Sequence, residues 1–461
     1  MIVEQIYTGC LSQGAYYVES NGEAAIIDPL REVDQYIEKA ESKNVKIKYV
    51  FETHFHADFV SGHITLSKKT GAPIIFGPNA NPDYQVIKAI DNQIFKIGDC
   101  SITVLHTPGH TMESTTYLLK DKNGKDHALF TGDTLFLGDV GRPDLSQKSD
   151  DMTMEDLAGI QFESLRNKIM PLADDVIVYP AHGAGSACGK NMMKETVDFL
   201  GNQKKMNYAL RADMTKEEFV KEVTDGLMPP PTYFPLNVKM NKEGYEDIES
   251  ILNRGYNPIP VSKFEDLANQ SEAIILDVRN QQDFIKGHIP RSIFIGLDGG
   301  FAPWVGTLLK DIKQKILLVS PVGREKETIT RLSRVGFDQT IGFLKGGFSS
   351  WKDSDKQMDT LISISAKQFE KEIIGKDSFI YDVRKFAEYE AARIDSAVNT
   401  PLSEINNYLS DFPENKNFYI HCAGGYRSVI AASILKSRGI HNLVDIKGGF
   451  KSIKETTIPT I

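Results

Sequence analysis

The sequence has few cysteines and tryptophans and no long hydrophobic run. Its 461 residues include 4 cysteines and 2 tryptophans. The cysteines, at positions 10, 100, 188 and 422, are far apart and form no paired motif, so a cytoplasmic chain with reduced thiols is the simplest interpretation. The N-terminus shows no export signal, and no apolar segment approaches the ~20 residues that cross a bilayer, so no membrane partner is expected.

An excess of positive charge is also missing. Lys and Arg number 53 against 62 Asp and Glu, which gives a formal net charge of -9. A nucleic-acid partner is therefore not expected, although local basic pockets remain compatible with this balance. Hydrophobic residues at 41% and charged residues at 25% are typical of a globular protein. At about 150 residues per domain, the length predicts three domains. The sequence leaves open whether the protein forms a homo-oligomer.

The first notable feature that is present is a loop rich in metal-ligating side chains. Residues 47–51 predict a buried strand, and His54, His56 and Asp58 follow it directly. A lone histidine at a strand end more often caps or covers that end. Three nitrogen and oxygen donors on one loop instead favour a transition-metal ion.

Three further predicted strand ends present the same kinds of side chain. They are His110 after a strand over 101–105, Asp133 after a strand over 128–130, and His182 after a strand over 175–179. Glycine and proline beside these residues let the backbone bend sharply at each strand end. The six candidate ligands on four separate loops predict one convergent metal site.

These motifs resemble the metallo-β-lactamase superfamily over roughly residues 1–210. The matching motifs are, in chain order, Thr-His-x-His-x-Asp, Thr-Pro-Gly-His-Thr, Thr-Gly-Asp-Thr-Leu-Phe and Pro-Ala-His-Gly. The resemblance implies an αββα sandwich with a metal site at one edge of two packed sheets. The likeness is greatest to the glyoxalase II and persulfide dioxygenase branch. Many members carry a second-metal ligand after the aspartate, but Phe59 stands there in this sequence, so one metal ion is favoured.

The persulfide dioxygenase resemblance also implies roles for individual residues. The iron ligands correspond to His54, His110 and Asp133, a 2-His-1-carboxylate set that would hold one Fe(II) per chain and leave positions open for oxygen and substrate. The side chains expected to orient water, substrate and ligands by hydrogen bonds are His56, Asp58 and His182.

Two neighbouring residues are candidates for substrate binding. Arg142, in a glycine-bearing loop over 138–144, matches an arginine that meets a carboxylate of the thiol substrate in the relatives; the alternative is a solvated loop charge. Cys188 either faces the same pocket or is a buried inert thiol, since thiol reactivity depends on its surroundings.

The end of the first domain is predicted near a proline-rich stretch. A polar, mixed-charge segment over 201–222 predicts a helix, and the four prolines of residues 228–235 predict a stiff, extended connector. The first domain is therefore assigned to residues 1–235. Residues 236–260 are expected to form an ordered lead-in to the next domain.

The rest of the chain contains one ~100-residue unit twice, which indicates a domain duplication rather than a solenoid. The tripeptide Asp-Val-Arg ends a predicted strand at 277–279 and again at 382–384, and Lys-Gly-Gly-Phe recurs at 345–348 and 447–450. Both copies resemble the rhodanese domain, which implies α/β folds with a mainly parallel sheet. They are assigned to residues 236–360 and 361–461. The predicted fold class is thus α/β throughout, a metallo-β-lactamase sandwich followed by two rhodanese-like domains.

The second copy carries a cysteine where chemistry is expected. A strand over 417–420 leads to Cys422 and Arg427 and then to an apolar helix. The positive end of the helix and the arginine both favour a thiolate and predict a lowered pKa for Cys422. The intervening loop residues are Ala423, Gly424, Gly425 and Tyr426. Cysteine phosphatases have five residues in this place, so the shorter loop fits a single sulfur atom better than a phosphate. The alternative is a buried structural cysteine.

The first copy has Ser320 in the corresponding place. A serine with no evident base cannot carry a sulfane sulfur, so this domain is expected to be catalytically silent and to act as a spacer or docking surface. Arg324 could still bind anions there, but an anion-binding role is not predicted.

Together the resemblances imply linked sulfur oxidation. A low-molecular-weight thiol persulfide, of glutathione, coenzyme A or a similar thiol, would be oxidised with O₂ to sulfite and thiol at a mononuclear non-haem iron. Cys422 would transfer sulfane sulfur, with thiosulfate formed or used, and the direction of transfer stays open. One alternative is a glyoxalase-II-like zinc hydrolase of glutathione thioesters, against which Phe59 and the attached sulfurtransferase count. The other is a sulfide-sensing or scaffold protein, against which the intact ligand set counts.

Overall fold

A computed structural model describes residues 1–145, 152–373 and 378–461. The chain forms two compact units. The first comprises Met1–Ile248 with Ser333–Gly336, and the second comprises Glu249–Leu332 with Phe337–Ile461. The first unit thus reaches past residue 235, where the sequence suggested its end. Pro235 lies in the first turn of helix α7 (Phe234–Glu243), where proline is well tolerated, and residues 232–233 form a turn, so the stretch predicted to be an extended connector ends in a turn and the start of a helix.

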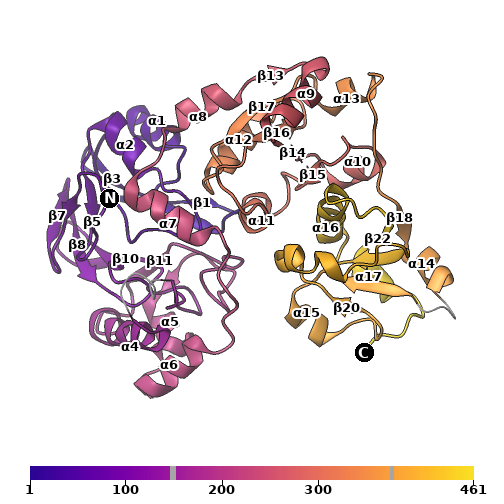
Figure 1. The fold of residues 1–461 in the computed structure, drawn as a ribbon. Helices are drawn as coiled ribbons and strands as arrows, with labels where there is room; N and C mark the ends of the chain where they lie inside the picture. Colours follow the sequence, from indigo (N-terminus) through magenta and orange to yellow (C-terminus); the bar gives the residue numbers. More distant parts are fainter. Residues whose placement is uncertain (146–151, 374–377) are drawn as a thin grey trace. The chain divides into compact units, whose positions relative to one another are not determined.

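The first unit is built from two mixed six-stranded sheets (Figure 1). The first sheet has, in spatial order, β1 (Ile2–Thr8), β2 (Gln13–Ser20), β3 (Glu23–Ile27), β4 (Lys46–Phe51), β5 (Ile74–Phe76) and β6 (Ile87–Lys88). The second has β12 (Asp198–Phe199), β11 (Ile177–Pro180), β10 (Asp126–Gly132), β9 (Thr115–Lys120), β8 (Cys100–His106) and β7 (Ile94–Ile97). Parallel pairing runs from β3 to β6 and between β10 and β11, and the other pairs are antiparallel.

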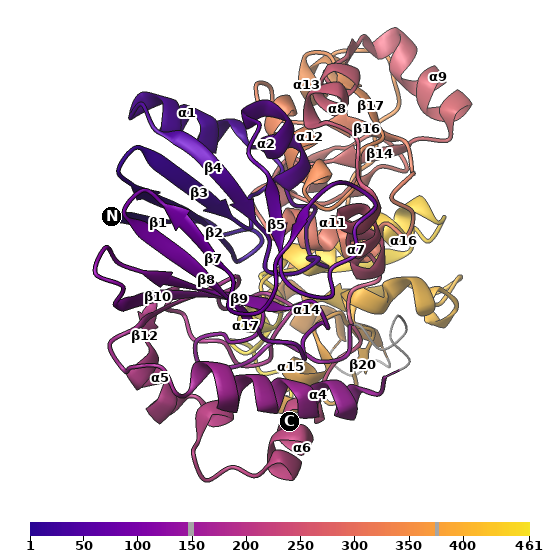
Figure 2. The same ribbon diagram turned by 90° about the vertical axis from the view of Figure 1, so that its left-hand side faces the viewer.

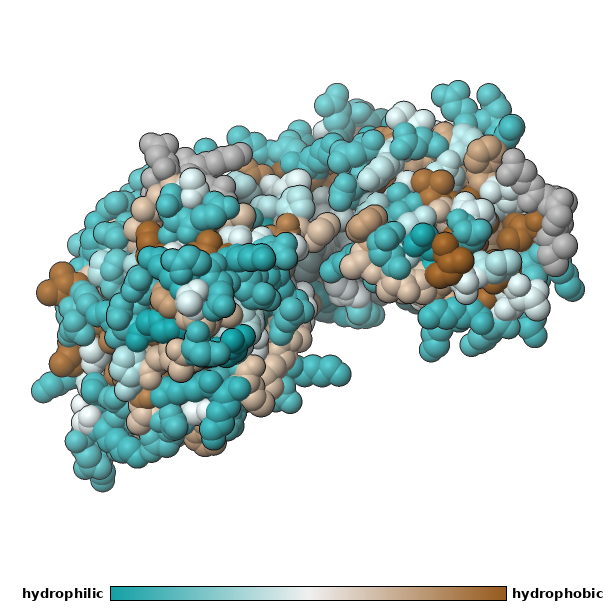
Figure 3. Space-filling model, turned by 90° about the horizontal axis from the view of Figure 1, so that it is seen from below, coloured by the Kyte–Doolittle hydropathy of each residue, from teal (hydrophilic) through white to brown (hydrophobic). Residues whose placement is uncertain are grey.

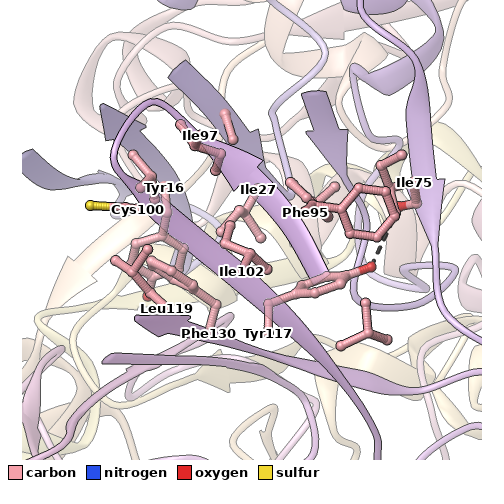
Figure 4. Packing of buried hydrophobic residues seen from close by; sticks show 14 of the residues in the cluster. Tyr16, Ile27, Ile75, Phe95, Ile97, Cys100, Ile102, Tyr117, Leu119 and Phe130 are labelled. Atoms are coloured by element: carbon pink, nitrogen blue, oxygen red, sulfur yellow. Dashed lines mark hydrogen bonds between the residues drawn. The ribbon is translucent and has the colours of Figure 1, made fainter. Parts of the chain in front are cut away.

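The two sheets pack face to face over an aromatic and aliphatic core (Figure 4). Tyr16 and Phe51 from the first sheet meet Phe95, Tyr117 and Phe130 from the second. The buried hydroxyl of Tyr117 donates to the carbonyl oxygen of Glu52 at 2.7 Å, so its polar end is satisfied across the sheet interface. Packing of the two inner faces sets the distance between the sheets. It therefore also sets the positions of the loops at the sheet edge.

Helices cover the outer faces of both sheets (Figure 2). Those of the first sheet are α1 (Asp34–Ser42) and α2 (His63–Thr70), and those of the second are α4 (Met154–Ser164), which continues into a short π-helix (Leu165–Ile169), α5 (Leu200–Met206) and α6 (Lys216–Thr224). This arrangement confirms the predicted αββα sandwich. The segment over 201–222 contains two helices rather than one, because Asn207 ends α5 and Thr215 begins α6 with a capping box to Glu218.

The second unit contains two five-stranded sheets in which every pair is parallel. The first has β13 (Pro258–Ile259), β17 (Thr340–Leu344), β16 (Ile316–Val319), β14 (Ile274–Asp277) and β15 (Ile293–Phe294). The second has β18 (Ser363–Ser365), β22 (Leu443–Lys447), β21 (Phe418–His421), β19 (Phe379–Asp382) and β20 (Val398–Asn399). The same strand order in both confirms the predicted duplication.

Each of these sheets has its own set of helices. The first copy has α8 (Ile248–Gly255), α9 (Val261–Ser271), α10 (Gln281–Lys286), α11 (Phe301–Leu308), α12 (Glu325–Ser333) and α13 (Gly347–Lys352). The second has α14 (Ala366–Ile373), α15 (Phe386–Ala391), α16 (Tyr426–Ser437) and α17 (Gly449–Ile453). Helix α16 is buried along most of its length, as its apolar sequence predicts.

The surface gives no sign of a membrane-spanning helix. Among the helices of the described ranges, none is both long and apolar enough to cross a bilayer. The face shown in Figure 3 is mostly hydrophilic, with hydrophobic side chains scattered in small groups.

Candidate metal centre and cysteine loop

Four strand ends bring the predicted metal ligands together. His54 follows β4 of the first sheet, whereas His110, Asp133 and His182 follow β8, β10 and β11 of the second. The ligand atoms of His54, His110 and Asp133 all lie within 4.8 Å of one another, and all three side chains are buried. The site therefore forms where the edges of the two sheets meet.

The geometry of these three residues fits a single ion. Nε2 of His110 lies 3.4 Å and Nε2 of His54 lies 3.9 Å from the same carboxylate oxygen of Asp133. Two atoms that bind one ion at about 2.1 Å each are expected roughly 3–4 Å apart. Nδ1 of His110 lies 2.8 Å from the carbonyl oxygen of Arg142, and Nδ1 of His54 lies 3.0 Å from the Thr53 hydroxyl, so both rings direct Nε2 toward Asp133.

The electrostatics of the site also favour a bound cation. Both carboxylate oxygens of Asp133 are buried without a hydrogen-bond partner among the described residues. An uncompensated buried carboxylate is strongly unfavourable, and a metal ion would remove that cost. Burial, together with the nearby imidazoles of His56, His110 and His182, lowers the pKa of His54 well below its usual value. A neutral imidazole is the form that ligates metals.

A second group lies beside the first. His56, Asp58 and His182 also place their ligand atoms within 4.8 Å of one another. Nε2 of His182 is 3.5 Å from a carboxylate oxygen of Asp58 and equally far from one of Asp133. Burial alone would lower the pKa of His182, but the two carboxylates outweigh it and raise that pKa. Phe59 is fully buried, and its ring centroid lies 4.4 Å from that of His56, so an apolar ring occupies this side of the group.

Two acidic residues behind His56 were not identified from the sequence. Nε2 of His56 is 3.1 Å from a carboxylate oxygen of Asp28 and 3.7 Å from one of Glu52. Asp28 also accepts hydrogen bonds from the backbone and hydroxyl of Thr53. Burial and the Asp28 carboxylate raise the pKa of Glu52 well above its usual value. Asp28 ends a strand like the other site residues, which is the signal that could have revealed it.

Helix α7 supplies a further residue that sequence reasoning missed. The Asn241 amide donates to the carbonyl oxygens of His56 and Phe59, both at 2.8 Å, and its oxygen accepts from the backbone N–H of Ser61 at 2.9 Å. Asn241 thus holds the loop that carries three of the predicted site residues. The contact spans about 180 residues of sequence, so no local pattern could have predicted it.

The two predicted substrate-binding residues also lie at the site. The guanidinium of Arg142 is buried and donates to Asp144 in a bidentate pair and to the carbonyl oxygens of Ala187 and Met228. The substrate role of Arg142 stays a prediction, and these bonds fix the loop whose carbonyl contacts His110. Sγ of Cys188 forms a buried group with Asp133 and His182. Burial and the nearby carboxylates raise the pKa of Cys188 to about 12, which keeps the thiol protonated near neutral pH.

In the second unit, Cys422 lies on the predicted strand-to-helix turn between β21 and α16. The thiol is buried, and Gly425 N–H donates to its sulfur at 3.1 Å. Gly425 has φ of +94°, a conformation that favours glycine. Arg427 forms a bidentate ion pair with Glu388 at 2.6 and 2.8 Å, and this pairing raises the arginine's pKa. The arginine therefore brings a positive charge to the loop together with its own counter-ion.

The corresponding loop of the first copy contains Ser320. Its hydroxyl lies 3.3 Å from that of Thr328 and within 3.2 Å of the carbonyl oxygen of Pro321. Arg324 forms ion pairs with Asp298 and Glu327, so its guanidinium already has carboxylate partners.

Comparison with known families agrees with both folds. The sequence pattern of the metallo-beta-lactamase superfamily matches residues 8–182. That of the rhodanese-like domain matches residues 261–354 and 365–456. The chain therefore consists of a metallo-β-lactamase domain with buried His and Asp groups of the metal-binding kind, followed by two rhodanese-like domains.

Individual relatives are distant. A metallo-beta-lactamase from Staphylococcus aureus subsp. aureus COL is 29% identical, with a TM-score of 0.66, over 75% of this chain and 98% of that one. ETHE1 from Myxococcus xanthus is 27% identical over 52% of this chain and 98% of that one, with a TM-score of 0.45.

Two curated relatives each match less than half of this chain. The cytoplasmic hydroxyacylglutathione hydrolase of Arabidopsis thaliana is 34% identical over 138 residues, or 29% of this chain, and the chain spans about half, 53%, of that relative's length. The hydroxyacylglutathione hydrolase GloC of Haemophilus influenzae is 28% identical over 202 residues, or 39% of this chain and 88% of the relative.

Proposed function

We propose that this protein oxidises low-molecular-weight thiol persulfides with O₂ to sulfite and free thiol, and that Cys422 couples the reaction to sulfane-sulfur transfer. The observation that carries the proposal is the combination of two sites on one chain. His54, His110 and Asp133 form a 2-His-1-carboxylate group beside an apolar Phe59, and a cysteine loop of rhodanese type follows in the second unit. Such a ligand set is typical of mononuclear non-haem iron enzymes that use oxygen.

His54, His110 and Asp133 would hold the iron. When bound, Fe(II) would supply open coordination positions for the persulfide sulfur and for dioxygen, and it would supply the redox activity that the oxidation needs. The chain's own residues define the rest of the pocket. Asp58 and His182 would orient water and substrate, and the protonated thiol of Cys188 would donate a weak hydrogen bond to an anionic sulfur.

The proposed reaction balances without a further reductant. A persulfide R–S–SH, O₂ and H₂O give R–SH, SO₃²⁻ and two protons. The sulfur–sulfur bond breaks, and four electrons pass from the two sulfur atoms to dioxygen. Both oxygen atoms of O₂ and one from water enter the sulfite.

Cys422 would carry out the transfer half. Its thiolate would attack the outer sulfur of thiosulfate, the bond to the sulfonate sulfur would break, and sulfite would leave while Cys422 keeps a persulfide. The reverse direction would convert sulfite and a Cys422 persulfide into thiosulfate. The Gly425 N–H, 3.1 Å from the sulfur, and the N-terminus of α16 would stabilise the anionic sulfur in either direction.

A competing function is hydrolysis of a glutathione thioester at a zinc site. The curated relatives named hydroxyacylglutathione hydrolases favour it. A zinc-bound hydroxide would then be the nucleophile. This function gives the cysteine loop of the second unit no role, whereas persulfide oxidation employs both sites.

Parallel assays of the full chain separate the two functions. Oxygen uptake and sulfite are measured with glutathione and coenzyme A persulfides, and thioester cleavage is measured with a glutathione thioester. We expect persulfide-dependent oxygen uptake in the wild type and none in His110→Ala. Thioester cleavage without oxygen uptake would support the hydrolase, and no turnover of any substrate would favour a sensing or scaffold role.

A further inference from the structure

The Cys422 loop is flexible by composition and needs outside support. Gly424 and Gly425 are adjacent, and a methyl group at Gly424 would meet no atom within 4 Å. Adjacent glycines have a large conformational freedom that folding must restrict. At its start the loop is held by α17, whose Phe450 N–H donates to the carbonyl oxygen of Cys422 at 2.6 Å. Beyond Gly425, the Arg427–Glu388 ion pair is a second support from the same copy, and Tyr426 lies between these two supports.

The first rhodanese-like copy contacts the loop through Tyr426. The hydroxyl of Tyr426 donates to the carbonyl oxygen of Gly296 at 3.0 Å. The Tyr426 ring lies edge-on to Phe294, with centroids 5.9 Å apart. It also packs directly over Gly299, where an added methyl group would overlap the phenol. Tyr426 is thus the first helical residue after the glycines and is anchored in the other copy.

Helix α16, which begins at Tyr426, lies beside α10 and β15 of the first copy (Figure 1). The backbone N–H of Phe294, in β15, donates to the Ser433 hydroxyl of α16 at 2.9 Å. Near the end of the helix, Lys436 forms an ion pair with Asp359 at 3.0 Å. Contacts from the first copy therefore fix both the position of α16 and its first turn.

The first copy has an acidic residue where the Cys422 loop has its arginine. Glu325 stands five residues after Ser320, as Arg427 stands five residues after Cys422. Its carboxylate accepts the N–H of Gly323 at 2.9 Å, the counterpart of the Gly425 amide that points at the Cys422 sulfur. In the first copy this backbone N–H is therefore bonded to a carboxylate of its own loop, whereas in the second copy it bonds the cysteine sulfur.

We propose that the first rhodanese-like copy holds the Cys422 loop in its sulfur-binding conformation, and that Tyr426 is the positioning residue through which it does so. The proposal rests on the proposed sulfur transfer for its function. The effect of the first copy on the conformation of the Cys422 loop can be tested even if the protein transfers no sulfur.

Two substitutions in the full-length protein test it. Gly299→Ala pushes the Tyr426 ring away, because the three atoms nearest to the added methyl group all belong to that phenol. Its matched control is Gly300→Ala, because a methyl group there would have ordinary contacts, the nearest at 3.4 Å to Trp304. Tyr426→Phe removes only the hydrogen bond to Gly296. The readouts are the rate of Cys422 alkylation by iodoacetamide against pH, followed by peptide mass spectrometry, and kcat and KM for transfer from thiosulfate to cyanide.

We expect Gly299→Ala to change the rate of Cys422 alkylation, because the loop around the thiol moves with Tyr426, and to lower kcat more than it changes KM. Tyr426→Phe should lower kcat roughly five-fold, the equivalent of one neutral hydrogen bond. Gly300→Ala should match the wild type, and persulfide-dependent oxygen uptake should stay unchanged in all three. If Gly299→Ala does not fold, Tyr426→Phe decides alone. If Tyr426→Phe has the alkylation profile and the kcat of the wild type, the proposal is overturned. If the wild type transfers no sulfur but the variants still alter the alkylation of Cys422, only the proposed sulfur transfer is refuted.

Discussion

Replacing Asn241 by leucine should destabilise the metal-binding loop although Asn241 binds no metal itself. The substitution removes three hydrogen bonds to the backbone of His56, Phe59 and Ser61, all of them buried. Each backbone group left unpaired costs about 1–3 kcal/mol. Allowing for relaxation of the loop, we expect a loss of at least about 3 kcal/mol, a large share of the ~5–15 kcal/mol that holds a typical domain folded.

Helix α7 offers a matched control one turn earlier. Asn237 is as buried as Asn241, but its side-chain nitrogen and oxygen have no hydrogen-bond partner in the part of the chain that the structure describes. Asn237→Leu therefore removes an unsatisfied polar group and should leave stability unchanged or raise it. Both variants replace a buried asparagine of the same helix by leucine. Asn241→Leu breaks side-chain hydrogen bonds, and Asn237→Leu breaks none that the described residues make.

Release of bound metal in urea is the appropriate assay. Both tryptophans, Trp304 and Trp351, lie in the second unit, so tryptophan fluorescence does not report on the metal domain. With m-values of about 1–3 kcal/mol per molar urea, the midpoint of metal release in Asn241→Leu should fall by at least about 1 M. Equal midpoints in Asn241→Leu, Asn237→Leu and the wild type would refute the role assigned to α7.

Other substitutions test the remaining parts of the molecule. Asp133→Ala should lose the bound metal, measured by elemental analysis; iron retained at the wild-type level would reassign the ligands. Cys422→Ser should abolish sulfur transfer while most persulfide-dependent oxygen uptake remains, and loss of both would make transfer an obligatory first step. Burial raises the pKa of Asp445 to about 6, so its stabilising contribution is complete below about pH 4 and is lost as pH rises through 6. Asp445→Asn should therefore stabilise the second unit by on the order of 2–3 kcal/mol at pH 7.5 and by nothing at pH 4, measured by calorimetry.

The sequence predicted the folds well because their signals are local. Strand ends with His or Asp next to Gly or Pro located the four loops of the metal centre, and the repeated Asp-Val-Arg and Gly-Gly-Phe motifs located the two parallel sheets. Each of these patterns lies within a few residues of sequence and follows directly from backbone geometry.

The contacts that support the sites were not predictable in this way. Asn241 lies in a helix beyond a proline-rich stretch, and nothing in its neighbourhood indicates that it bonds the loop around His56. In the sequence, nothing near Tyr426 likewise indicates that its hydroxyl bonds Gly296 of the other copy. The ion pairs of Arg142 with Asp144 and of Arg427 with Glu388 were not predicted either. Their geometry depends on loop conformations that amino-acid composition does not determine.

Metal content and activity measured on one sample test the central claim most directly. The purified chain is analysed for iron and zinc, stripped, and reloaded with each metal in turn, and persulfide-dependent oxygen uptake is followed at every stage. We expect one iron per chain, loss of oxygen uptake on stripping, and recovery with iron but not with zinc. Full oxygen uptake by the iron-free protein, or thioester cleavage restored by zinc alone, would contradict the proposed function.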